Sequence, residues 1–183
     1  MFRKFLGVVC LCIFLGSAPA FAQEEGGGGI VYGSEIGVLV SAPEGWIFDS
    51  KSGVSQGLYA VMYPKGSTWS NSNAMMYVNI VISNDSSLDT FIAGDVEVFK
   101  KNSPKIVVEK AKPISLTGGL SAEVRLYSGD QWGNYECVAY ASKGKSVAIY
   151  VLSSRSKEDF KKSLDAFRAM VAKSVLMNVN IQK

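Results

Sequence analysis

The stretch Ala74–Ile82 reads AMMYVNIVI and is apolar on both of its alternating faces. A strand with one apolar face borders solvent, whereas a strand that is apolar on both faces is covered on both sides. Two later segments can supply these covers, because each carries apolar residues at helical spacing along a single face. We therefore predict an α+β fold: an α/β/α sandwich in which a central, mainly antiparallel sheet carries a helix on each face.

The two helices are expected at Ser86–Lys101 and from Ser156 onward. Ser86 and Asp89 have the spacing of a capping box, as do Ser156 and Asp159. The apolar stripe of the second helix consists of Phe160, Leu164, Phe167, Met170 and Val171.

Short segments of strand character surround the helices and are separated by turn signals rich in glycine. The expected strands, besides Ala74–Ile82, are Gly37–Ser41, Trp46–Phe48, Leu58–Tyr63, Ile106–Lys112, Leu120–Tyr127, Trp132–Ala141 and Ser146–Leu152. Pro64–Asn73 (PKGSTWSNSN) is polar and is expected to be an exposed loop.

Residues 1–22 have the three parts of a secretory signal. Arg3 and Lys4 are basic, Phe5–Leu15 is apolar and uncharged, and small residues lead up to Ala22. We expect cleavage after Ala22 and a periplasmic or extracellular protein without an integral membrane span. Retention of this segment as an N-terminal anchor is the alternative.

The expected mature chain is one nearly neutral domain behind a short tether. Residues 23–29 (QEEGGGG) are predicted to be flexible, because four consecutive glycines favour disorder entropically. Residues 30–177 contain no further linker or repeat and are predicted to form a single domain. Without Arg3 and Lys4 the chain holds 17 basic and 16 acidic residues, which argues against a nucleic-acid partner. We expect this chain to be a monomer.

The residue types present exclude several chemistries. The sequence has no histidine, which argues against Ser-His-Asp and Cys-His catalysis and against His-ligated metals. Cys137 is the one cysteine of the expected mature chain and is expected to be a small buried hydrophobe. Two Ser-x-x-Lys pairs, Ser142 with Lys145 and Ser154 with Lys157, occur about as often as chance predicts. We assign no catalytic residue, cofactor or metal site and expect no enzyme; a hydrolase of unrecognised type is a further alternative.

Several strings resemble the PsbP-like family over nearly the whole expected mature chain. Ser41–Trp46 (SAPEGW) is similar to the opening Pro-x-Gly-Trp segment of that family, and Gly57–Pro64 leads a strand into a polar loop that contains Trp69. The resemblance implies an α/β/α sandwich and a non-catalytic accessory or binding role, as in extrinsic photosystem II subunits and a factor that binds the Ran GTPase. The histidines that bind metal in some photosynthetic members have no counterpart here.

Two tryptophans are the candidate partner contacts. Trp69 lies in a polar loop, and Trp132 is predicted to open a strand just after a turn; large apolar side chains in such places often bind partners. The alternative is that each folds back onto the core. We expect an exported, non-enzymatic accessory or protein-interaction module of the cell envelope. A carrier that holds a small hydrophobic ligand between helix and sheet, lined by Met75, Met76 and Tyr77, is the second hypothesis.

Overall fold

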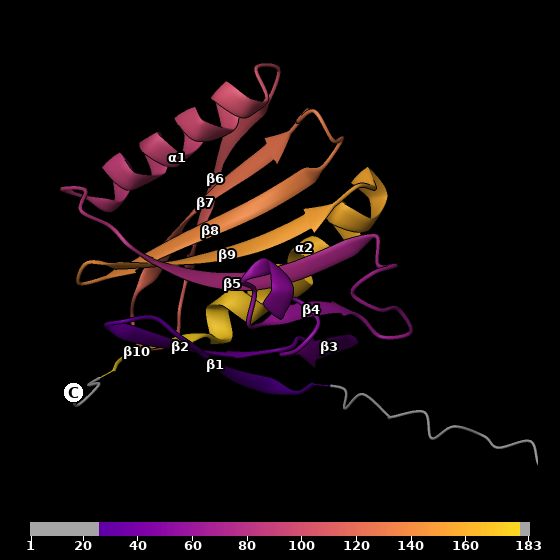
Figure 1. Cartoon of the computed structure of the whole chain (residues 1–183), viewed down its shortest axis with the longest axis horizontal. Coiled ribbons are helices and arrows are strands. Elements are labelled where there is room, and N and C mark those ends of the chain that lie inside the picture. The colour runs from indigo at the N-terminus through magenta and orange to yellow at the C-terminus, as the bar shows by residue number, and fades with distance from the viewer. Residues whose placement is uncertain (1–25, 180–183) are drawn as a thin grey trace, which may run out of the picture.

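The computed structural model describes residues 26–179, in which the strands form two antiparallel sheets (Figure 1). The expected signal peptide and the start of the tether lie outside these residues. The elements are β1 (Gly28–Tyr32), β2 (Ile36–Ser41), β3 (Trp46–Asp49), the 3-10 helix η1 (Val54–Gln56), β4 (Val61–Pro64), β5 (Ala74–Ile82), α1 (Leu88–Asn102), β6 (Val107–Ser115), β7 (Ser121–Ser128), β8 (Tyr135–Lys143), β9 (Ser146–Ser154), α2 (Lys157–Lys173) and β10 (Val175–Asn178).

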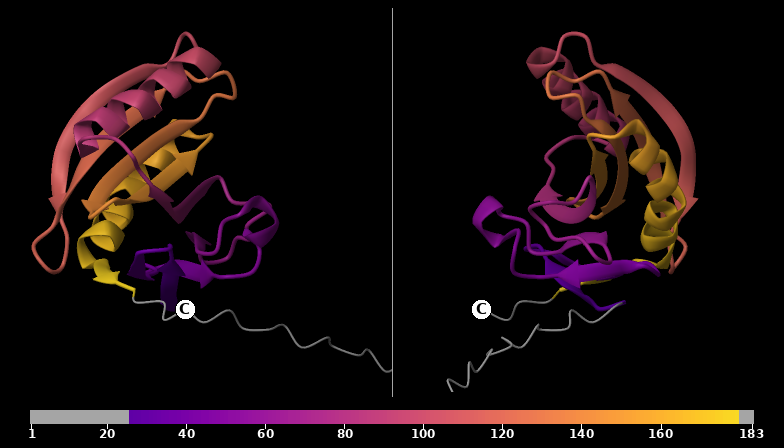
Figure 2. Two further views of the ribbon diagram at one scale, coloured as in Figure 1. Left: turned by 60° about the vertical axis from the view of Figure 1, so that its left-hand side comes forward. Right: turned by 90° about the vertical axis from the view of Figure 1, so that its right-hand side faces the viewer.

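The larger sheet, sheet A, has seven strands in the order β3-β4-β5-β9-β8-β7-β6. The stretch Ala74–Ile82 forms β5, as predicted, and pairs along its whole length with β9. The two helices cover opposite faces of this sheet (Figures 1 and 2). We call the α1 side the front face and the α2 side the back face. The predicted α+β sandwich is confirmed.

Successive residues of the central strands enter different cores. On the back face, Cys137 and Ala139 of β8 pack with Phe167 of α2. On the front face, Val138 of β8 packs with Ile92 of α1. This alternation explains why the central strands carry apolar residues on both faces. Within residues 26–179, neither helix is long and apolar enough to cross a membrane.

The smaller sheet, sheet B, was not predicted; its order is β1-β2-β10. In β10, Leu176 lies opposite Val38 and is buried in the back core. The predicted central sheet is sheet A, and the predicted strand Gly37–Ser41 lies in sheet B as part of β2. The tether prediction was wrong at its C-terminal end, because β1 begins at Gly28 rather than near Ile30.

The glycines at the start of β1 are used for close packing. A Cβ atom at Gly28 would lie 2.7 Å from the carbonyl oxygen of Val40, and one at Gly29 would lie 2.9 Å from Cζ of Phe48. A larger residue at Gly28 would collide with backbone, and one at Gly29 would require the Phe48 ring to shift. The entropic cost of ordering glycine is therefore offset by a contact that other residues cannot make.

Several element boundaries differ from the predictions, and three of the differences are instructive. The N-cap of α1 is Ser87 and not Ser86, since the Thr90 N–H donates to Ser87 Oγ at 3.1 Å. The N-cap of α2 is Ser156, as predicted. Leu58 belongs to the turn after η1, because its N–H donates to the Gly53 carbonyl, so β4 begins only at Val61. The third boundary, at the start of β8, concerns Trp132 and is described below.

Candidate binding groove

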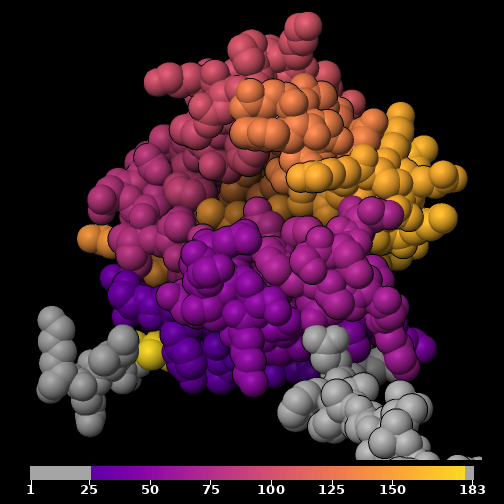
Figure 3. Space-filling model, turned by 45° about the vertical axis from the view of Figure 1, so that its right-hand side comes forward, coloured from indigo at the N-terminus to yellow at the C-terminus, as the bar shows by residue number. Residues whose placement is uncertain are grey.

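Two adjoining clefts hollow the front face of sheet A over β5 and β9 (Figure 3). Their volumes are about 410 and 650 Å³. Both are lined by Trp69, Ser70, Met75 and Ser153. We treat them as one feature, the front groove, because these four residues join them.

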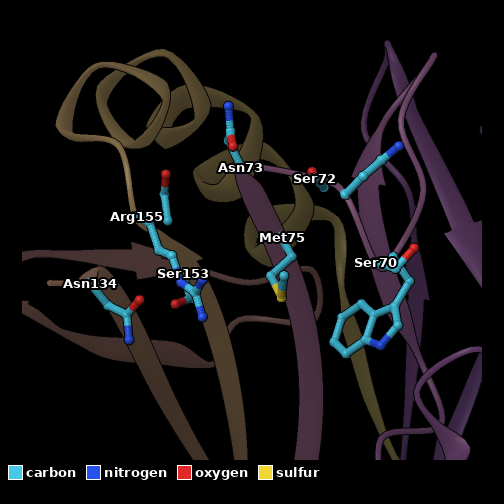
Figure 4. Close-up of a pocket in the computed structure, with 10 residues that line it drawn as sticks. Ser70, Ser72, Asn73, Met75, Asn134, Ser153 and Arg155 are labelled. Atoms are coloured by element: carbon cyan, nitrogen blue, oxygen red, sulfur yellow. The ribbon is translucent and has the colours of Figure 1, made fainter. Parts of the chain in front are cut away.

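The floor of the front groove comes from neighbouring strands of sheet A. Met75 and Tyr77 lie two positions apart in β5 and therefore face the same side. Ser153 of β9 is the register partner of Met75. Around this floor stand polar side chains of the β4–β5 loop on one side and of the β8 and β9 ends on the other (Figure 4). The labelled wall residues are Ser70, Ser72, Asn73, Asn134 and Arg155.

Hydrogen bonds within the β4–β5 loop hold this wall in shape. The Thr68 N–H donates to Oδ1 of Asn71 at 2.7 Å, and Ser67 Oγ donates to the Pro64 carbonyl at 2.6 Å. Ser72 Oγ donates to the Ala74 carbonyl at 2.5 Å. A loop with so many internal bonds loses little entropy when a partner binds.

Trp69 is half-buried and has two neighbourhoods. It packs against the small cluster of Ile47, Val61 and Tyr63, and it lines both parts of the front groove. Trp69 thus covers part of the core, which was the alternative interpretation, and its role as a partner contact stays a prediction.

Trp132 is 63% exposed and lies in the turn before β8. The prediction that it opens a strand was wrong. The Asp130 carboxylate accepts the N–H groups of Trp132 and Asn134 at 3.1 and 2.7 Å, which holds both residues in the turn. Asn134 lines the groove, whereas Trp132 stands outside it, two residues along the chain. The structure thus does not bring the two tryptophans into one site.

Glu136, which the sequence analysis did not single out, lies beside the groove floor. It is the register partner of Ser153, and paired residues of neighbouring strands point to the same face. Burial raises the pKa of its carboxyl, the Ser153 hydroxyl opposes this shift, and the charges of Asp130 and Asp95 add to it. The signal in the sequence is a single acidic residue inside the apolar run of β8.

Comparison with known proteins bears on the fold. No family model matches the chain, and no curated protein matches it. The solution structure of cyanobacterial PsbP (CyanoP) from Synechocystis sp. PCC 6803 aligns over 89% of this chain and 99% of its own, with a TM-score of 0.54 and 14% identity. The chain has the PsbP-like fold. A mutant of the protein Mog1 aligns over 83% of this chain and 96% of its own, with a TM-score of 0.46 and 15% identity.

In this PsbP-like domain a chain of hydroxyl groups connects α1 to the front face of the sheet. The Tyr140 hydroxyl donates to Oδ2 of Asp95 at 2.6 Å, and the hydroxyls of Tyr127 and Tyr140 lie 2.9 Å apart. Burial raises the pKa of Tyr127 to about 12 and that of Tyr140 further. Both phenols therefore remain protonated near neutral pH and act as hydrogen-bonding groups.

The Ser-x-x-Lys pairs of this PsbP-like domain lie apart from the front groove or are otherwise engaged. Ser154 is buried and its hydroxyl donates to the Ser156 carbonyl at 3.0 Å. Ser142 and Lys145 line a smaller cleft of about 260 Å³ near the start of α1. The groove itself is lined by an aromatic ring, a thioether, hydroxyls, amides and a guanidinium group, which are groups that bind other molecules by packing and hydrogen bonding.

Proposed function

We propose that this protein is an exported, non-enzymatic interaction module of the cell envelope and that the front groove is the surface that holds a protein partner. The observation that carries the proposal is the groove itself: an open cleft over the sheet, walled by a hydrogen-bonded loop and lined by Trp69 and Met75. Aromatic and methionine side chains are enriched in protein interfaces. The exposed Trp132 lies outside the groove, two residues from the groove residue Asn134, and we propose it as a second contact of the same partner.

The groove favours a partner segment over an enclosed hydrophobic ligand. Met75 and Tyr77 face the front groove, whereas Met76 is fully buried in the back core. The three residues of the carrier hypothesis therefore lie on opposite faces of β5 and do not line one cavity. We accordingly prefer the interaction module to the carrier.

The proposal that the protein is exported has its own test. The proposal expects the envelope form of the protein to begin at Gln23, after cleavage behind Ala22. N-terminal sequencing of protein from the envelope fraction measures this. An intact N-terminus with the chain held in the membrane would instead support the anchor alternative.

Site-specific photo-crosslinking tests the binding surface. A photoreactive phenylalanine analogue is placed at Ser70, which lines both clefts, at Trp132, and at the exposed Lys161 of α2 as a control. Crosslinking in intact cells is expected to give the same partner adduct from Ser70 and Trp132 and none from Lys161. Equal adducts from all three positions, or none from the first two, would contradict the proposal.

A Ser70→Tyr variant provides an independent check, because the larger side chain fills the groove while Ser70 itself is exposed. We expect this variant to capture at least about tenfold less of the partner than the unmodified protein does. Ser121→Tyr, at an exposed residue of β7, is the matched control and should capture the partner normally.

A further inference from the structure

Arg155 is the one charged residue among the described residues that line the two clefts of the front groove. The other lining residues are serines, asparagines, a glutamine and apolar or aromatic residues, and none of them is acidic. Arg155 is exposed, and Figure 4 shows its side chain extending from the end of β9 into the cleft, toward Ser153. Within residues 26–179 its guanidinium group forms no hydrogen bond and no ion pair. The groove therefore carries one positive charge that the described part of the chain leaves unpaired.

The strand register places Arg155 between two asparagines. At this end of sheet A the last register pairs join Ser154 of β9 to Ala74 of β5 and to Tyr135 of β8. One step beyond these pairs, the three strands present three residues that line the first cleft: Asn73, Arg155 and Asn134. Because neighbouring strands run about 5 Å apart, these side chains form one polar row across the end of the groove.

Two acidic residues of the same region do not neutralise Arg155. The Asp130 carboxylate accepts hydrogen bonds from neutral donors of its own turn, the N–H groups of Trp132 and Asn134 and the Asn134 side-chain amide at 2.9 Å. Glu136 lies one row further into the sheet and lines neither cleft. An anionic group that enters the first cleft therefore meets a guanidinium group in its lining and no carboxylate.

We propose that the front groove binds a segment of the protein partner that carries an aspartate or glutamate side chain, and that this carboxylate pairs with Arg155. The inference rests on the proposed function and adds the chemistry of the partner. A guanidinium group has parallel N–H donors that match the two oxygens of a carboxylate, and such charge-assisted pairs are stronger than neutral hydrogen bonds. The side-chain amide of Asn73, which has no hydrogen-bond partner within residues 26–179, supplies a further donor in the same row.

The second cleft adds an apolar requirement to the acidic one. Leu58, Trp69, Met75 and Tyr77 line it together, and Trp69 and Met75 continue into the first cleft. An apolar side chain of the same partner segment would pack against these residues. The groove is thus expected to select a segment in which an acidic and an apolar residue lie a short distance apart.

The test uses pools of heptapeptides, each with an uncharged dye at the N-terminus and an amide at the C-terminus, on the immobilised protein. One pool has glutamate at the centre and the other has glutamine, its neutral isostere, while the flanking positions are random mixtures of apolar and hydroxyl residues. We expect the glutamate pool to be retained about tenfold more strongly, in the range of a charge-assisted hydrogen bond. The Arg155→Gln protein should retain both pools within about twofold of each other.

The matched control is Lys161→Gln, which removes one positive charge from an exposed position of α2 and should keep the glutamate preference. A third pool, with glutamine at the centre and a free C-terminal carboxylate, distinguishes a side-chain carboxylate from a chain end.

Four outcomes overturn the inference. They are equal retention of the glutamate and glutamine pools by the unmodified protein, a glutamate preference that survives Arg155→Gln, loss of this preference in Lys161→Gln, and stronger retention of the third pool than of the glutamate pool. In each case a partner adduct from Ser70 would show that the interaction module stands and that only its proposed chemistry has failed.

Discussion

At the scale of single residues, Glu136 is placed where its charge works against folding. Its folded-state pKa is raised by burial and by nearby acids, so the folded state holds the proton more tightly than the unfolded chain does. The contribution of this carboxyl to stability is therefore greatest at low pH and is lost as the pH rises through the folded-state pKa. A residue that lowers stability at neutral pH is typical of a functional surface.

The first prediction follows from this fall in stability with rising pH. Glu136→Gln mimics the protonated carboxyl, so we expect its thermal unfolding midpoint to exceed that of the unmodified protein at about pH 7.5. The advantage should shrink as the pH falls toward 4, where the carboxyl of the unmodified protein binds its proton. Scanning calorimetry across this pH range measures both effects. An advantage that is constant with pH would mean that charge is not its cause.

Cys137 is 1% exposed, and the prediction that it is a small buried hydrophobe is confirmed. Burial raises the pKa of its thiol to about 12, which leaves little thiolate at neutral pH. We expect alkylation by iodoacetamide at about pH 8 to be at least roughly 100-fold slower in the folded protein than in concentrated guanidinium chloride. Mass spectrometry of the alkylated protein measures both rates, and rapid labelling of the folded protein would contradict the described burial.

At the scale of elements, the start of α1 distinguishes two adjacent serines. The Ser87 side chain accepts the Thr90 N–H, so Ser87→Ala should destabilise the protein by about 1 kcal/mol. Ser86 lies outside the helix and its hydroxyl lies 3.4 Å from that of Thr90. Ser86→Ala should therefore cost less than about 0.5 kcal/mol. Urea denaturation of both variants measures the free energy of unfolding. Equal losses would mean that Ser86 and Ser87 contribute equally to capping α1.

The helices, β5 and the hairpins of sheet A follow from periodicity and turn residues, which are local properties of the chain. The remaining features depend on contacts between residues that are far apart in the sequence. Sequence spacing alone does not decide between Ser86 and Ser87, and Gly28 enters a strand because Val40 lies against it. β10 directly follows α2 with only Ser174 between them, so no turn signal announces it.

Less of the groove than of the fold could be predicted from the sequence. Trp69 was identified from its place in a polar loop, but its neighbours Ser153 and Glu136 become meaningful only through the pairing of β5, β9 and β8. Register is set by the whole sheet, and one residue of slip would send each of these side chains to the other face. Trp132 was identified as exposed but assigned to the wrong element.

At the scale of the whole molecule, the C-terminal strand closes the back core. Leu176 of β10 is 5% exposed and belongs to the core that contains Phe167 and Met170. We expect Leu176→Ala to destabilise the protein by about 2–5 kcal/mol, as large-to-small changes in cores do. Leu39, in the same sheet, is 40% exposed, so Leu39→Ala should cost less than about 1 kcal/mol. Urea denaturation of both variants measures the change in the free energy of unfolding. Equal changes would mean that β10 contributes little to the back core.

Sheet B also determines how the protein would respond to a pulling force. β1 and β10 run parallel to each other on either side of β2, with Gly28 opposite Ser41 and Asn178 opposite Ile36. The first residue of β1 and the last residue of β10 therefore lie at opposite ends of the sheet along the strand direction. Because ladder hydrogen bonds lie across the strands, tension between these ends shears them all together.

The β7–β8 hairpin would respond differently, since Ser121 and Lys143 lie at the same end of it. Tension applied between these two residues would open the hydrogen bonds one at a time. Single-molecule force measurements should therefore record a higher rupture force from the chain ends than from this hairpin, and the reverse order would contradict the shear geometry. If the protein were held at one end while a partner pulled on the other, the hydrogen bonds of sheet B would therefore resist the force together.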